Sequence, residues 1–111
     1  MNADQTRRIV ATVEGMRDNL IELTRALVAC RTDSQSADNP DYGPEAQRCQ
    51  DIVASHLDGS GMEVQRWVED DRYPVVAGRL AGTGGGRSLA INGHVDVVPV
   101  GDTSAWSHDP W

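Results

Sequence analysis

The sequence predicts an α/β protein in which helices cover a mixed sheet. Apolar residues recur every three or four positions over 4–30 and again over 44–57, which is typical of amphipathic helices. Between 62 and 99 the apolar residues instead fall in short runs separated by glycine and aspartate, which is typical of strands and turns. The order helix, helix, strand, strand, strand favours a layered α/β architecture.

The first predicted helix covers residues 4–30. A coiled coil is an alternative use of its apolar stripe, but the flanking charges lack a regular pairing and Gly15 interrupts the pattern. We therefore expect this helix to pack on a sheet. The stripe consists of residues at alternating spacings of four and three: Ile9, Val13, Met16, Leu20, Leu23, Leu27 and Cys30.

A loop and a second helix follow. Residues 32–43 are rich in Ser, Asp, Asn, Pro and Gly, which favour turns. Pro44 suits the first turn of a helix, and Gly59 and Gly61 are expected to end that helix after Leu57. Its predicted buried face carries Ala46, Cys49, Val53 and Leu57.

Three strands are predicted in the second half of the chain. Residues 62–69 and 75–80 form the first two, with a polar turn at 70–72 between them. The glycine-rich segment 82–86 is expected to make a hairpin-like turn into a third strand, 88–99. A phosphate-binding loop is disfavoured, because the glycines lead into a strand rather than a helix and no Gly-Lys pair follows them.

The third predicted strand is apolar at its start and ends at a proline. Leu89 and Ile91 are typical of a buried strand, Gly93 allows a neighbouring backbone to approach closely, and Pro99 stops the run. We therefore expect this strand to deliver the residues that follow Gly93 to its end.

Composition narrows the classes of function. A chain of 111 residues suffices for one small domain. The net charge of -7 argues against a nucleic-acid partner, which would require a basic surface. All basic side chains are arginine, so neither a Schiff-base lysine nor a phosphate-binding lysine is present. The sequence shows no signal-peptide pattern and no membrane span, so we expect a cytoplasmic protein. Cys30 and Cys49 are expected to be buried, reduced thiols.

The most informative chemistry lies in the triplet His94-Val95-Asp96. Alternate residues of an extended segment share a face, so His94 and Asp96 can point into one cavity. A carboxylate that accepts one imidazole N–H leaves the other nitrogen free to bind a metal ion. From the residues alone, alternatives stay open: Asp96 is itself a ligand or caps a local turn, and His94 is a hydrogen-bonded structural histidine.

The segments 92–99 and 106–111 resemble the zinc metallopeptidase family that includes acetylornithine deacetylase, succinyl-diaminopimelate desuccinylase, aminoacylase and glutamate carboxypeptidase. The order of helices, strands and glycine-rich turn is also similar, so the resemblance covers essentially the whole chain. It implies that residues 1–111 are the amino-terminal portion of a three-layer α/β/α catalytic domain. It further implies that His94 ligates one of two active-site zinc ions and that Asp96 is the catalytic acidic residue that orients it.

The same resemblance implies an activity and its requirements. The implied reaction is hydrolysis of the amide bond in N-acyl amino acids or small peptides by a complete protein that carries a further domain and forms a homodimer. Cobalt or manganese suits the same mixed nitrogen and oxygen ligands. The remaining ligands and the general base are expected beyond these residues, so the segment alone is expected to be inactive. The alternative is a non-catalytic metal-binding or structural remnant of a truncated reading frame.

Two further features lie near the end of the chain. His108 and Asp109 form a second imidazole and carboxylate pair, but adjacent side chains rarely reach one ion and Pro110 stiffens the turn. An exposed loop histidine is therefore the favoured interpretation of His108. Trp106 and Trp111 are expected either to wall a substrate entrance or to pack in the interior.

Overall fold

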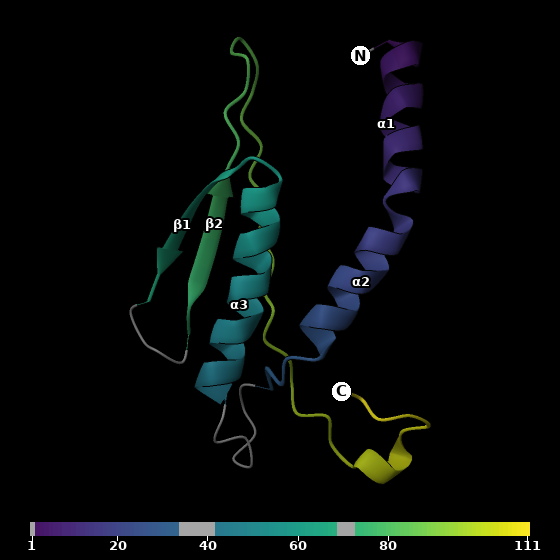
Figure 1. Ribbon diagram of the computed structural model, residues 1–111, viewed down its shortest axis with the longest axis vertical. Coiled ribbons are helices and arrows are strands. Elements are labelled where there is room, and N and C mark those ends of the chain that lie inside the picture. Colours follow the sequence, from purple (N-terminus) through teal and green to yellow (C-terminus); the bar gives the residue numbers. More distant parts are fainter. Residues whose placement is uncertain (1, 34–41, 69–72) are drawn as a thin grey trace.

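The computed structural model describes residues 2–33, 42–68 and 73–111, and its elements confirm the mixed α/β class. Within these ranges lie the helices α1 (Ala3–Gly15), α2 (Arg17–Val28) and α3 (Tyr42–Gly59), the strands β1 (Glu63–Trp67) and β2 (Val75–Arg79), and a short 3-10 helix, η1 (Thr103–Ala105) (Figure 1). No helix in these ranges has the length and apolar character needed to cross a membrane. The predicted polar turn at 70–72 and most of the predicted loop 32–43 lie outside the described residues.

The single helix predicted over 4–30 is two helices. The backbone of Met16, at φ -90° and ψ 1°, leaves the helical region and separates α1 from α2 directly after Gly15. Glycine favours such a break because its backbone has more freedom to lose in a helix than that of any other residue. The start of α1 is well defined, since Asn2 and Gln5 bond reciprocally to each other's backbone N–H groups, each at 2.8 Å.

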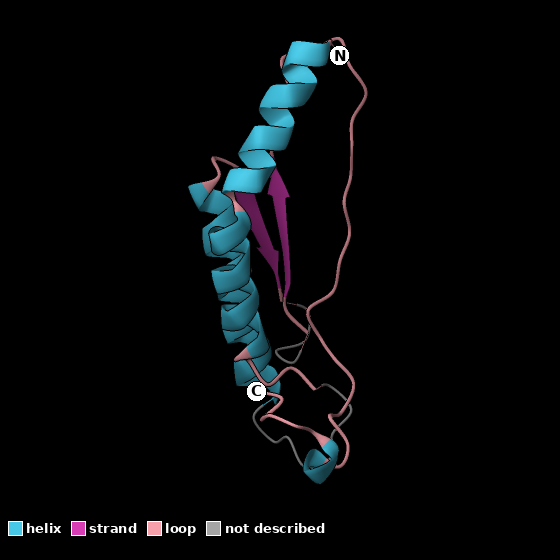
Figure 2. Ribbon diagram, turned by 90° about the vertical axis from the view of Figure 1, so that its right-hand side faces the viewer, coloured by secondary structure: helices cyan, strands magenta, loops and turns pink. Residues whose placement is uncertain are grey.

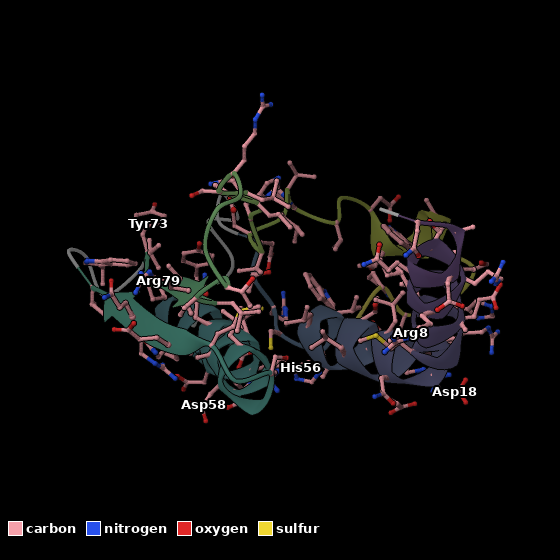
Figure 3. The ribbon with its side chains drawn as sticks, turned by 90° about the horizontal axis from the view of Figure 1, so that it is seen from above. Arg8, Asp18, His56, Asp58, Tyr73 and Arg79 are labelled. Carbon is pink, nitrogen blue, oxygen red and sulfur yellow. The ribbon has the colours of Figure 1, made fainter. Side chains whose placement is uncertain are left out.

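The prediction that the apolar stripe of residues 4–30 packs on a sheet is wrong. We call α1 and α2 together the helical arm. The arm extends away from the strands, and α1 contacts no described element except α2 (Figure 1). Seen from above, Arg8 and Asp18 of the arm lie far from Tyr73 and Arg79 of the hairpin (Figure 3). The large apolar side chains of the arm that are more than half exposed are Ile9, Val13, Leu20 and, between the two helices, Met16.

Helix α3 takes the place on the hairpin that the arm was expected to take. It runs alongside both strands (Figure 2), and these are antiparallel with Val64 opposite Gly78. A Cβ built on Gly78 would lie 3.2 Å from Cδ1 of Leu57, so the helix approaches the sheet closely at this glycine. The predicted second helix and first two strands are thus confirmed. The buried core side chains of α3 are Ala46, Cys49 and Ala54.

The predicted third strand is wrong for most of its length. Leu89 and Ile91 are 86% and 89% exposed, and the described part of 88–99 contains only an isolated bridge at Val97. The hairpin pairing across the glycine-rich segment is absent as well, because β2 pairs only with β1 in the described sheet. A strand requires a neighbour to receive its backbone hydrogen bonds, and local sequence does not reveal whether one is present.

Candidate metal-binding site

The site begins with a junction between α2 and α3. Glu45 on α3 accepts a hydrogen bond from the backbone N–H of Arg31, 3.1 Å away, and a bond from Arg48 at 2.9 Å. Arg48 also donates to the carbonyl of Ala29 at the end of α2. The hydrogen bond from Arg48 lowers the pKa of the Glu45 carboxyl, and the bond from Arg31 adds to this effect. These contacts fix the chain direction just before Thr32.

Thr32 and Asp33 connect this junction to the segment that carries the predicted site. Asp33 and Val97 form a parallel β-bridge, and the Val97 N–H donates to the Thr32 carbonyl at 2.9 Å. The Thr32 hydroxyl donates to the carbonyl of Val95 at 2.7 Å. Thr32 and Asp33 are each only 2% exposed. The segment around Asp96 is therefore held from within the fold, although it is not part of a longer strand.

The structure brings His94 and Asp96 together. Nδ1 of the imidazole lies 3.2 Å from Oδ1 of Asp96 and 2.9 Å from the Asp96 carbonyl oxygen. Both neighbours are acceptors, so this geometry favours the tautomer with the proton on Nδ1. In that tautomer Nε2 carries a free electron pair. The arrangement suits a ligand histidine whose orientation is set by a neighbouring carboxylate.

The pair is open to its surroundings. The side chains of His94 and Asp96 are 81% and 50% exposed. In the described ranges, no group of three or more His, Cys, Asp and Glu side chains lies close enough to hold a metal ion. A structural zinc site uses four protein ligands and a catalytic site uses three. The described residues therefore present part of a donor set and not a complete one.

A mostly apolar cavity of about 460 Å³ adjoins His94. Trp106 lies on its wall and donates from Nε1 to the Val100 carbonyl at 3.0 Å. Trp111 lies on the same wall, with the guanidinium carbon of Arg31 5.5 Å from the centre of its ring. The remaining lining residues come from α2, the bridge and the end of the chain: Leu27, Val28, Cys30, Thr32, Val95, Val97, Val98, Pro99, Val100 and Pro110.

Both tryptophans thus share a cavity with the histidine, and Trp106 is 51% exposed and so is not packed in the interior. His108 is exposed. The carboxylate of its neighbour Asp109 accepts the Trp111 N–H at 2.9 Å and so stabilises the final turn. The structure does not bring His108 and Asp109 together as a chelating pair.

Tyr42, at the start of α3, is a neighbour of the site that the sequence did not reveal. Burial raises the pKa of its phenol, and the negative charge of Asp96 adds to the rise, followed by smaller effects of Tyr73 and Cys49. The Tyr42 and Tyr73 rings are 5.8 Å apart. No local pattern relates Tyr42 to Asp96, because the fold alone brings these distant positions close.

The two cysteines are free and buried, as predicted. They meet where the end of α2 packs on α3. Burial, together with the charge and hydrogen bonding of the neighbouring Cys30, raises the pKa of the Cys49 thiol to about 12. A thiol with so high a pKa is protonated at neutral pH and is a poor metal ligand. The described residues thus form an α/β segment in which the imidazole of His94 lies against the carboxylate of Asp96.

Comparison with known proteins identifies the group to which this segment is related. The chain is 34% identical over 101 residues to N-formyl-4-amino-5-aminomethyl-2-methylpyrimidine deformylase of Bacillus subtilis, which covers 89% of the chain and 22% of the relative. Succinyl-diaminopimelate desuccinylases of Cereibacter sphaeroides and Magnetococcus marinus are 35% and 36% identical, and each match covers 82% of the chain and 21% of the relative. No family model and no solved structure matches the chain.

Over most of its length the chain is homologous to these desuccinylases and this deformylase. The resemblance inferred from the segments 92–99 and 106–111 is thereby confirmed. The chain spans about a fifth of the length of the curated relatives it matches.

Proposed function

We propose that the chain is the amino-terminal part of a zinc-dependent hydrolase that cleaves the amide bond of N-acyl amino acids or small peptides. The names of the relatives support the reaction class, because a desuccinylase and a deformylase each remove an acyl group. One observation carries the assignment of the site: the contacts of Nδ1 of His94 with Asp96 leave Nε2 available to a cation.

The donors present fit a zinc ion. Neutral imidazole nitrogen and carboxylate oxygen are both common zinc ligands. When bound, zinc lowers the pKa of a coordinated water and polarises a substrate carbonyl. In this proposal His94 donates the electron pair of Nε2, and Asp96 accepts a hydrogen bond from Nδ1–H and so orients the ring. Further ligands and the general base come from other parts of the full-length protein, so the 111 residues alone do not catalyse the reaction.

The cavity beside His94 is assigned to the substrate. Its volume of about 460 Å³ is within the range of small-molecule sites, and Trp106 and Trp111 supply rigid apolar walls.

The proposal also includes a homodimeric full-length protein and the use of cobalt or manganese in place of zinc. A cytoplasmic location accords with two free buried thiols, since such thiols persist in reducing compartments.

Zinc titration of the metal-free, full-length protein tests the proposal. Replacement His94→Ala removes the only nitrogen donor of the pair, and we expect the affinity for one zinc ion to fall by more than about 100-fold, beyond the loss typical of outer-shell partners. His56→Ala is the matched control, because His56 is an exposed histidine on α3 (Figure 3). Equal zinc affinity in the wild type and in His94→Ala would eliminate His94 as a ligand.

A further inference from the structure

We propose that Thr32 is a positioning residue for the His94 and Asp96 pair. The proposal rests on the metal-binding function assigned to that pair. Thr32 makes two hydrogen bonds to one short stretch of backbone: its hydroxyl donates to the Val95 carbonyl at 2.7 Å, and its carbonyl accepts the Val97 N–H at 2.9 Å. The two bonded groups lie on either side of Asp96.

This placement controls the direction of the Asp96 side chain. Each hydrogen bond restricts the orientation of one peptide group, and the orientations of the two peptide groups that flank a residue determine its φ and ψ. The Cα–Cβ bond of Asp96 is then held in one direction. Asp96 in turn contacts Nδ1 of His94 through both its carboxylate and its carbonyl oxygen. Thr32 therefore acts on the imidazole through Asp96.

Burial explains why the hydrogen bonds of Thr32 can order the site more firmly than the contact between His94 and Asp96 does. Thr32 is 2% exposed, whereas the His94 side chain is mostly exposed and the Asp96 side chain is half exposed. An exposed hydrogen bond between two side chains orders them weakly, because water competes for the same groups. The hydroxyl of the buried Thr32, bonded to a backbone carbonyl, meets less of this competition.

The position of Thr32 is itself defined by the helices. Its N–H donates to the Cys30 carbonyl at 2.9 Å, and the preceding N–H of Arg31 donates to Glu45 on α3. Through these hydrogen bonds of Thr32, the positions of α2 and α3 determine where the backbone around Asp96 lies. Thr32 also lines the cavity beside His94. Direct contact of the hydroxyl with substrate is therefore the competing role that the experiment has to separate from positioning.

The experiment uses the full-length, metal-free protein and compares Thr32→Val with Thr32→Ser. Valine keeps the shape of threonine and removes the hydroxyl, whereas serine keeps the hydroxyl. The matched control is Thr24→Val, because the Thr24 hydroxyl also donates to a carbonyl at 2.7 Å, that of Leu20, but lies on an exposed helix. Unfolding midpoints of all variants are measured alongside, and Thr32→Ala replaces Thr32→Val if the valine variant does not fold.

The first measurement is zinc affinity by chelator competition, together with the visible spectrum of the cobalt-substituted protein. Thr32→Val is expected to lose about 10- to 100-fold in affinity and to change the cobalt spectrum, as outer-shell partners typically do. Thr32→Ser is expected to stay within about threefold of the wild type, and Thr24→Val to match it. A Thr32→Val variant with the affinity and spectrum of Thr24→Val overturns the proposal. An increase in substrate KM with unchanged zinc affinity also overturns it, since that pattern indicates contact with substrate.

The second measurement needs no metal. Imidazole ¹⁵N shifts at pH 8, assigned by comparison with His94→Ala, report which ring nitrogen carries the proton. The wild type and Thr32→Ser are expected to hold the proton on Nδ1 of His94, and Thr32→Val to lose this preference. An unchanged tautomer in Thr32→Val refutes positioning by Thr32. If His94→Ala leaves the zinc affinity unchanged, the metal-binding function is refuted. If Thr32→Val still changes the tautomer of His94 in that case, the effect of Thr32 on the imidazole remains established.

Discussion

At the scale of single residues, the contact between His94 and Asp96 was predictable from the sequence, and the hydrogen bonds from Thr32 that hold the backbone around Asp96 were not. Two side chains separated by one residue in extended backbone share a face, so the contact follows from local geometry. The hydrogen bond from Thr32 spans 63 positions, and no rule of spacing identifies its partner. Thr32 begins the segment 32–43, whose Ser, Asp, Asn, Pro and Gly content predicts a loop, and such a composition does not reveal that the Thr32 hydroxyl is buried.

The Cys49 thiol provides a prediction about pH. Its pKa rises from an ordinary value of 9.0 to about 12 in the fold, so the folded protein retains the thiol proton more tightly than the unfolded chain. The resulting contribution to stability is fully present below pH 9 and is lost as the pH rises from 9 towards 12. In the folded protein, alkylation of Cys49 by iodoacetamide is expected to keep accelerating above pH 9, because the thiolate is the reacting form.

Peptide-resolved mass spectrometry of samples alkylated between pH 7 and pH 12 measures this directly. The same protein in urea is the control, and there the rate is expected to level off near the ordinary thiol pKa. A rate in the folded protein that also levels off near pH 9 would contradict the high pKa. Cys49 lies in the core of α3, so its shift reports the packing of that helix.

At the scale of elements, periodicity predicted the parts of the chain whose partners are adjacent in sequence. Helix α3 and strands β1 and β2 follow one another and pack together, so their apolar patterns describe their actual surroundings. The pattern of residues 88–99 is equally apolar, yet the described structure gives it a single bridge to Asp33. Hydrophobic periodicity shows which face of a helix or strand is apolar, but it does not show whether another element packs on that face.

The contact between α3 and the hairpin predicts the effect of a methyl group at Gly78. A Cβ there would lie 2.9 Å from Sδ of Met62 and 3.3 Å from Cβ of Leu57, so the Met62 side chain has to move and Leu57 on the helix has to give way slightly. We expect Gly78→Ala to cost about 1 to 3 kcal/mol, as overpacking typically does. Amide hydrogen exchange across β1 and β2 is expected to accelerate by about 5- to 150-fold, measured by mass spectrometry of the full-length protein.

Gly86→Ala is the control for this substitution, because a Cβ on Gly86 meets nothing within 4 Å. Its exchange pattern is expected to match the wild type. Slow exchange in Gly78→Ala equal to that of Gly86→Ala would show that the helix does not press on the strand at this point.

At the scale of the whole molecule, the chain is more extended than a compact domain. Its radius of gyration is 17.4 Å, whereas a compact domain of this length has about 13 Å. The helical arm accounts for part of the difference, since α1 contains no buried residue. The extended segment with Leu89 and Ile91 accounts for another part.

This exposure predicts how the 111-residue polypeptide behaves when it is produced alone. Leu89 and Ile91 present apolar surface on an extended backbone, which favours association with other chains. Sedimentation velocity is expected to show oligomers that grow with concentration. The double replacement of both residues by glutamine is expected to reduce this association, with Arg87→Gln as a control on the same exposed segment. A monodisperse monomer of the unaltered polypeptide would show that these side chains do not drive self-association.

The outer position of α1 also has a practical consequence for studying this chain. A fluorophore or spin label on the first turn, at Asp4 for example, would sit on an exposed helix whose contacts with other described elements are confined to α2. Such a label would report the motion of the arm while leaving the imidazole at position 94 undisturbed.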